Sequence, residues 1–162
     1  MNKNIAILIP TINAGGAEKQ ASLLASLLSD KYNVCVILYS GEAKTNVTNV
    51  KRLEDANINV FKLVGNTFSK MRELKSILKE NEIDYLFNYL TKPNFVGAIV
   101  AKKVGVKHIY NGIRNSRIDW WKLILERLAH NHYATATIYN CYSGEEYFSN
   151  KGLKKEKAIW SI

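Results

Sequence analysis

The stretch IAILIPTINAGGAEKQASLLASLLSDKYNVCVILYSG, residues 5–41, decides the fold. Its runs at residues 5–10 and 33–40 are too apolar to be half exposed, and they predict two buried strands. Between them, residues 18–29 carry one apolar helical face, formed by Ala21, Leu24, Ala25 and Leu28. Ser22 is predicted to face solvent. A strand, a helix and a second strand of these lengths predict a βαβ unit with parallel strands.

The rest of the chain repeats this alternation. Further strands are predicted at residues 59–63, 84–90, 107–113, 136–142 and 157–162. Helices are predicted at residues 69–80, 94–104, 120–132 and 145–150, whereas residues 42–57 are polar and ambiguous, with a helical turn at 50–56. We therefore expect a single α/β domain over residues 1–162, with a doubly wound, Rossmann-like, mostly parallel sheet and helices on both faces.

The charge of the chain indicates the kind of partner it attracts. It has 23 Lys and Arg residues against 14 Asp and Glu, which gives a net charge of +9. A field of this sign attracts nucleic acid, anionic headgroups or phosphorylated substrates. The sequence lacks zinc-ligand spacing and a helix-turn-helix pattern, so nucleic acid is not the expected partner. A basic nucleic-acid-binding module and a flavodoxin-like small-molecule module remain the alternatives.

The location expected from the sequence is the cytoplasm. The first apolar run breaks at Pro10, which is too early for a signal peptide, and no window approaches the roughly 18 uninterrupted apolar residues of a spanning helix. Cys35 and Cys141 both fall inside predicted strands. Two buried thiols of this kind suit a reducing compartment.

Gly15 and Gly16 stand between the first strand and the first helix. Ligands of doubly wound sheets bind beyond the carboxyl ends of the strands, where a helix N-terminus offers free N–H groups to an anion. The dinucleotide fingerprint is excluded because Lys19 stands where a third glycine is needed. A P-loop is excluded because Ala17, rather than lysine, follows the pair. A turn without a ligand remains the alternative.

These residues carry a resemblance to a known family. Pro10 and Thr11, followed by GGAE at residues 15–18 and an apolar-faced helix, resemble glycosyltransferase family 4, of the two-domain GT-B architecture. DYLFNYL (84–90) and HIYNGIRNS (108–116) resemble the fourth and fifth strands of its N-terminal domain. Residues 136–162 resemble the segment leading to the interdomain hinge, so the resemblance spans essentially the whole chain.

The resemblance implies a reaction and a missing half. Such enzymes transfer a sugar from a nucleotide-sugar to a glycan or lipid-linked acceptor, with retention, and need no cofactor or metal. The family places the donor in a second, C-terminal domain, which residues 1–162 do not contain. We therefore expect an isolated N-terminal, acceptor-side domain that is inactive alone and serves polysaccharide or lipid-linked glycan assembly.

The resemblance also suggests binding residues. Gly15 and Gly16 would close over the donor diphosphate or the reacting sugar. Arg114 is a candidate phosphate or acceptor contact, with a surface salt bridge as the alternative, and Asn115 is a further acceptor candidate. Further acceptor candidates are predicted in the loops after strands one and four: Thr11, Asn13, Thr91, Lys92 and Asn94. Caps and turns are the alternative for these five residues.

No catalytic residue is identified. His108 lies at the wrong end of its strand for the active edge of the sheet. His130 and His132 close a predicted helix, where an imidazolium would favour the helix dipole, and we expect them to cap it.

The segment RNSRIDWWKLILERL, residues 114–128, combines aromatic rings with cations. Trp120, Trp121 and Lys122 are therefore candidates for contact with an anionic membrane surface, which would make the protein peripheral on the inner face of the cytoplasmic membrane. The alternative is an ordinary amphipathic helix with one tryptophan in the core. In that case the buried face would continue through Leu123, Ile124 and Leu128.

Overall fold

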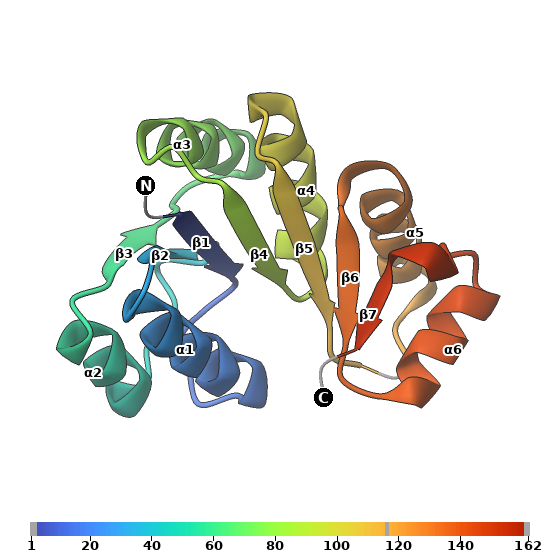
Figure 1. Ribbon diagram of the computed structural model, residues 1–162, viewed down its shortest axis with the longest axis horizontal. Coiled ribbons are helices and arrows are strands. Elements are labelled where there is room, and N and C mark those ends of the chain that lie inside the picture. The colour runs from blue at the N-terminus through green and yellow to red at the C-terminus, as the bar shows by residue number, and fades with distance from the viewer. Residues whose placement is uncertain (1–2, 116, 161–162) are drawn as a thin grey trace.

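The computed structural model describes residues 3–115 and 117–160, so Ser116, Ser161 and Ile162 of the predicted segments lie outside the described residues. The strands within them form one sheet of order β3-β2-β1-β4-β5-β6-β7, in which every neighbouring pair is parallel (Figure 1). The strands are β1 (Asn4–Ile9), β2 (Asn33–Leu38), β3 (Asn59–Lys62), β4 (Tyr85–Tyr89), β5 (His108–Ile113), β6 (Ala136–Tyr139) and β7 (Ala158–Trp160). The α-helices are α1 (Gly16–Ser29), α2 (Val47–Asp55), α3 (Thr67–Glu80), α4 (Thr91–Val104), α5 (Trp120–Leu128) and α6 (Tyr142–Asn150). The predicted Rossmann-like α/β fold is confirmed.

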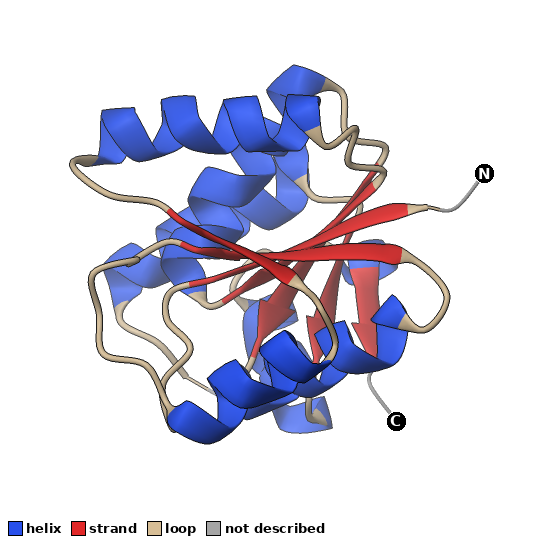
Figure 2. Cartoon of the chain, turned by 90° about the vertical axis from the view of Figure 1, so that its left-hand side faces the viewer, coloured by secondary structure: helices blue, strands red, loops and turns tan. Residues whose placement is uncertain are grey.

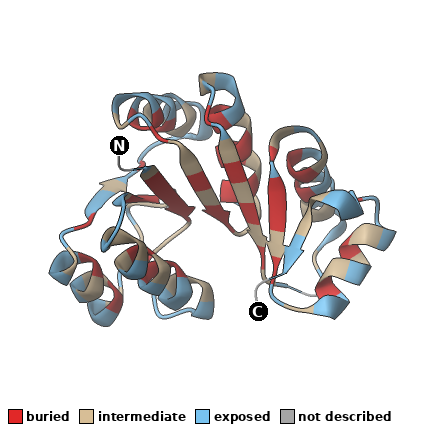
Figure 3. Cartoon of the chain, in the orientation of Figure 1, coloured by how far each residue is buried: buried red, intermediate tan, exposed pale blue. Residues whose placement is uncertain are grey.

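Helices cover both faces of the sheet (Figure 2). The central strand β1 sends Ala6 and Leu8 into a core shared with α3 and α4. Its alternate residues, Ile7 and Ile9, enter a second core shared with α1 and α2. Burial on both sides explains why this strand is an unbroken apolar run, and Figure 3 shows it buried along its length.

Several predicted boundaries are wrong, each for a local reason. α2 begins at Val47 because the Asn46 side chain accepts a hydrogen bond from the Asn49 amide at 3.1 Å, which caps the helix. α4 begins at Thr91, so the candidates Thr91, Lys92 and Asn94 form its first turn and do not lie in a loop. The helix predicted at residues 120–132 changes at Ala129 into a π-helical segment that ends at Tyr133.

The two cysteines differ from each other. Cys35 is buried in β2, and burial raises the pKa of its thiol to about 12. Cys141 lies beyond the end of β6, at the N-cap of α6, and is half-buried. Its predicted place inside a strand is wrong because β6 ends at Tyr139.

His130 is a core residue and not a helix cap. Its side chain is fully buried, with Nδ1 2.7 Å from the Thr137 hydroxyl and Nε2 2.9 Å from the Lys154 carbonyl oxygen. Burial lowers the pKa of the ring, which disfavours the imidazolium that a capping role needs. His132 is exposed.

Candidate functional site

The carboxyl ends of the strands lie along one edge of the sheet, at the lower side of Figure 1. The strand order reverses at β1 and β4, because β1 leads to β2 on one side and β4 leads to β5 on the other. Doubly wound sheets bind ligands outside such a reversal. The residues that follow β1, β4, β5 and β6 are therefore the ones that can build a site.

The glycine pair starts α1, with Gly15 at the N-cap in an extended conformation. A Cβ on Gly15 would collide with the carboxylate of Glu18, which also accepts a hydrogen bond from the Thr11 hydroxyl at 3.1 Å. A Cβ on Gly16 would meet nothing within 4 Å. A side chain at position 15 would require the flexible end of Glu18 to move, while the space beside Gly16 is open. The Glu18 carboxylate therefore lies beside the start of α1, where an anion would approach.

The loop before α1 is held by α2. Asn49 is 4% exposed, and its Nδ2 donates to the carbonyl oxygen of Asn13 at 2.7 Å. Its Oδ1 accepts from the Ser22 hydroxyl at 3.2 Å and from Arg52 at 3.0 Å. The prediction that Ser22 faces solvent is wrong, because these partners satisfy its hydroxyl inside the α1–α2 contact. The Ser22 hydroxyl also donates to the Lys19 carbonyl oxygen at 2.9 Å, but Asn49 and Arg52 lie 27 and 30 positions away, so helical periodicity alone does not indicate them.

Replacing Asn49 with alanine should loosen the glycine loop. The change removes the donor to Asn13 and leaves buried polar groups without partners, so we expect the free energy of unfolding to fall by about 1–3 kcal/mol. Amide hydrogen exchange should also speed up at residues 13–17. Thr48, which is exposed one position earlier, provides the matched control Thr48→Ala. Unchanged exchange at the loop in Asn49→Ala would contradict the anchoring role.

A cavity of about 380 Å³ opens between α1 and the ends of β4, β5 and β6. Its lining residues are Gln20, Leu24, Phe87, Asn88, Tyr89, Tyr110, Gly112, Arg114, Ile138 and Asn140. The Arg114 guanidinium carbon lies 5.6 Å from the centroid of the Tyr89 ring, a cation–π distance. Burial raises the pKa of Tyr89 despite the opposing charge of Arg114, so the phenol stays neutral beside the cation.

Of the predicted site residues, Arg114 is the one that lines this cavity. Thr11, Asn13 and Gly15 lie on the loop that precedes α1, Gly16 is the first residue of that helix, and Asn115 is exposed after β5. The sequence interpretation missed Gln20 and Asn140. Asn140 directly follows β6, just as Arg114 directly follows β5. The strand was predicted to continue to residue 142, and an end at Tyr139 would have indicated Asn140 as a site residue.

Asn94 is fully buried and engaged by its neighbours. Its Nδ2 donates to both carboxylate oxygens of Glu126 at 3.0 Å and to the Gly112 carbonyl oxygen at 3.1 Å. Glu126 is 2% exposed, and burial raises its pKa to about 7 although the hydrogen bonds from Asn94 and Thr91 act in the opposite direction. In this arrangement Asn94 ties α4, α5 and the end of β5 together, and it is not open to an acceptor.

The backbone is strained where β4 meets α4. Leu90, the N-cap of α4, has φ 70° and ψ 160°, a region that is essentially restricted to glycine. Its amide donates to the Gly112 carbonyl oxygen at 3.4 Å, so the strained residue is held against the end of β5. Strain of this kind concentrates at functional sites, and here it lies at the same edge as the cavity.

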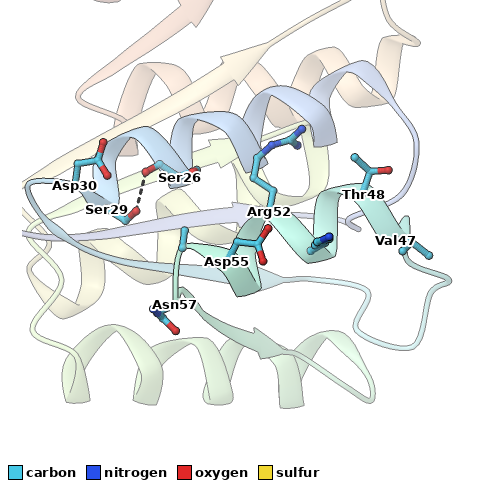
Figure 4. A pocket seen from close by; sticks show the side chains of 10 residues that line it. Ser26, Ser29, Asp30, Val47, Thr48, Arg52, Asp55 and Asn57 are labelled. Carbon is cyan, nitrogen blue, oxygen red and sulfur yellow. Dashed lines mark hydrogen bonds between the residues drawn. The ribbon is translucent and has the colours of Figure 1, made fainter.

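A larger hollow, of about 690 Å³, lies between α1 and α2 (Figure 4). Its walls include Ser26 and Ser29 at the end of α1 and Val47 and Thr48 at the start of α2. It is an open groove on the outer surface of two helices, away from the strand ends where the other candidates gather. We therefore assign the candidate site to the cavity beside Arg114.

In residues 3–115 and 117–160, His, Cys, Asp and Glu do not form a group of three that could hold a metal ion. No helix in these residues is long and apolar enough to cross a bilayer.

Comparison of the sequence with known proteins finds no matching family model. One curated relative is the GalNAc-alpha-(1->4)-GalNAc-alpha-(1->3)-diNAcBac-PP-undecaprenol alpha-1,4-N-acetyl-D-galactosaminyltransferase of Campylobacter jejuni. It is 31% identical over 108 residues, which are 64% of this chain and 30% of that protein. The chain therefore spans less than a third of the curated relative.

Solved structures share the fold over nearly the whole chain. HepE from Anabaena, crystallised in complex with UDP, gives a TM-score of 0.80 at 18% identity. The match covers 99% of this chain and 43% of the HepE chain. The lipopolysaccharide outer core galactosyltransferase WaaB gives a TM-score of 0.73 at 15% identity, and the match covers 96% of this chain and 44% of WaaB. UDP-N-acetylglucosamine 2-epimerase from Rickettsia bellii has the same fold, with a TM-score of 0.67 at 13% identity. The match covers 99% of this chain and 44% of the epimerase. The resemblance stated from the sequence is confirmed: the chain resembles a glycosyltransferase in sequence and has the Rossmann-like fold found in GT-B glycosyltransferases.

Proposed function

We propose that this chain is the acceptor-side half of a retaining glycosyltransferase that uses a nucleotide-sugar. The observation that carries the proposal is Arg114, placed over the Tyr89 ring in the wall of the cavity at the carboxyl edge. A guanidinium held at a cavity wall can pair with a phosphate group through two hydrogen bonds. Asn140 and Gln20 line the same cavity and supply groups that can bind sugar hydroxyls.

The donor would come from a second domain that closes over the strand ends. In the transfer, the bond from the anomeric carbon of the sugar to the donor phosphate breaks, and a bond to an acceptor hydroxyl forms with release of its proton. Negative charge develops on the leaving diphosphate, and the free amides at the start of α1 can stabilise it once the Glu18 carboxylate has moved away from Gly15.

The acceptor class proposed is a glycan or a lipid-linked sugar. A sugar carried on a lipid diphosphate presents the anion that Arg114 would bind and the hydroxyls that Asn140 and Gln20 would bind. Such an acceptor would place the protein at the inner face of the cytoplasmic membrane. The curated relative has an undecaprenol-linked acceptor in its name, which supports this choice over a soluble glycan.

Replacing Arg114 with alanine should weaken binding of a diphosphate to the isolated chain. We expect the dissociation constant of farnesyl diphosphate, measured by titration calorimetry, to rise about tenfold or more, because a charge-assisted hydrogen bond contributes about 1.5–3 kcal/mol. Arg117→Ala, which removes an exposed arginine three positions later, is the control. Equal affinities for the wild-type chain and Arg114→Ala would exclude Arg114 as the anion contact.

The reaction itself is tested with the full natural coding sequence. We expect its product to move sugar from a UDP-sugar to a lipid-linked acceptor, detected by mass spectrometry, while residues 1–162 alone transfer none. Epimerases share this fold, so the same samples are analysed for the UDP-sugar without acceptor. Conversion of free UDP-N-acetylglucosamine to its 2-epimer, with no product on the acceptor, would overturn the proposal.

A further inference from the structure

Helix α5 divides its apolar residues between the core and the surface. Its fully buried residue is Glu126, which faces Asn94, and Leu123 packs against the core cluster that contains Phe148. Four other large apolar residues are exposed: Trp120 is 74% exposed, Trp121 42%, and Ile124 and Leu128 41% each. The alternative interpretation of the sequence is therefore wrong for the tryptophans and for Ile124 and Leu128, and it is correct for Leu123. An amphipathic helix of a globular protein normally turns such residues toward the core.

The exposed residues form one continuous stripe. At about 100° per residue, Trp120, Ile124, Leu128 and Trp121 fall within an arc of about 100°, and Glu126 falls on the opposite side of the helix. We call these four residues the α5 stripe. Isolated exposed apolar residues are ordinary, but four on one face of a short helix mark a contact surface.

The charges beside the stripe are of one sign. Arg127, next to Trp120 on the helical wheel, is exposed, and so is Arg117 in the loop before the helix. Lys122 lies 5.2 Å from the Trp121 ring and is paired with Asp119 at 2.6 Å. Within residues 117–128 the other acid is Glu126, which is buried. The surface therefore presents apolar rings and free arginines without an unpaired exposed carboxylate.

A second basic segment lies beside Arg127. A Cβ on Gly152 would approach the Arg127 Cδ to 3.2 Å, which places the loop after α6 against α5. Lys151, Lys154 and Lys155 in this loop are all exposed. The positive surface is therefore wider than the helix, and Glu156 is the one acid between residues 151 and 157.

We propose that the α5 stripe docks the protein onto an anionic lipid bilayer. The tryptophan and aliphatic side chains enter the headgroup boundary, and the arginines beside them contact lipid phosphates. A protein partner would need matching acids, whereas a bilayer of anionic lipids supplies the complementary charge at every point of the surface. The proposal does not depend on sugar transfer, and its test contains no sugar.

The test is binding of the 162-residue chain to lipid vesicles. We expect it to co-sediment with vesicles of phosphatidylcholine and phosphatidylglycerol and not with vesicles of phosphatidylcholine alone. Binding should weaken strongly between about 0.1 M and about 1 M salt, where the Debye length falls from about 10 Å to about 3 Å. Trp120→Ser should reduce the partition coefficient about tenfold. Phe68→Ser is the matched control, because Phe68 is 78% exposed on the remote helix α3.

Fluorescence tests which surface enters the lipid. The chain has three tryptophans, so Trp160→Phe leaves emission from Trp120 and Trp121. Their emission should shift to the blue when anionic vesicles are added. Three outcomes would overturn the proposal: no binding to anionic vesicles at low salt, equal loss of binding in Phe68→Ser, or a dimer in solution that Trp120→Ser dissociates without any effect of lipid. The last result would assign the stripe to a second copy of the chain.

Discussion

Replacing Gly97 with alanine is expected to lower the free energy of unfolding by about 1–3 kcal/mol. Gly97 is buried on the side of α4 that packs against the sheet. An added Cβ would approach the Leu8 Cδ2 to 2.7 Å and would collide with the Asn88 side-chain oxygen. Both neighbours belong to the sheet, so the helix has to move away from β1 and β4.

The measurement is chemical denaturation of Gly97→Ala and of a matched glycine variant. Gly16→Ala adds the same methyl group where nothing lies within 4 Å, and it should be neutral or stabilising by up to about 1 kcal/mol. Asn88 lines the cavity and donates to Asn111 at 2.9 Å, so Gly97→Ala should also disturb the candidate site. Equal stabilities of the two variants would show that α4 does not need this close approach.

Replacing Glu126 with glutamine is expected to stabilise the protein at alkaline pH. In the folded protein Glu126 keeps its proton up to about pH 7, whereas the unfolded chain loses it near pH 4.5. Between these values the folded state binds more protons, so the free energy of unfolding falls as the pH rises. Each pH unit corresponds to about 1.4 kcal/mol, and the total penalty above pH 7 is about 3 kcal/mol. Glutamine cannot ionise and avoids this penalty.

The prediction is tested by denaturant unfolding at a series of pH values. Glu126→Gln and the wild-type protein should be similarly stable near pH 4, and the variant should be the more stable by about 3 kcal/mol near pH 8. Glu80→Gln, an exposed substitution at the end of α3, should leave the pH profile unchanged. Parallel curves for wild type and Glu126→Gln would mean that the carboxyl titrates at an ordinary pKa.

A neutral side chain at position 126 is also favoured by the neighbouring Asn94 side chain. Among the described residues, the side-chain oxygen of Asn94 is buried and has no hydrogen-bond partner. A protonated carboxyl or a glutamine amide has a hydrogen to donate in this region, and a carboxylate does not. The same substitution therefore tests whether the α4–α5 contact is held by a neutral pair.

The sequence predicts the sheet better than it predicts the contacts between helices. Every strand was located because apolar runs such as residues 5–10 have no other explanation in a βαβ chain. The alternative orientation of α5, with Ile124 and Leu128 buried, is wrong because periodicity assumes that apolar residues turn inward. Glu126 is buried with Asn94, 32 positions away, and only the folded chain brings this pair together.

The candidate site was predictable where it follows from strand ends. Arg114 was suggested by the resemblance of residues 108–116 to the fifth strand of a known family, and its place directly after β5 agrees with a parallel sheet whose carboxyl end faces a ligand. Asn94 was wrongly placed in a loop because its buried partners could not be read from its neighbours in the sequence. The anchoring of Asn13 by Asn49 was missed for the same reason, since α2 was not recognised as a whole helix.

The strand order has a consequence for how the chain is made. β1 pairs with β2 on one side and with β4 on the other, and the Asn4 amide donates to the Asp84 carboxylate across 80 positions of sequence. At about 5–20 residues per second, a ribosome adds those residues in roughly 4–16 seconds. During this time the first three strands have an open apolar edge at β1. The nascent chain is therefore most exposed to aggregation, and most in need of a chaperone, before its fourth strand has been synthesised.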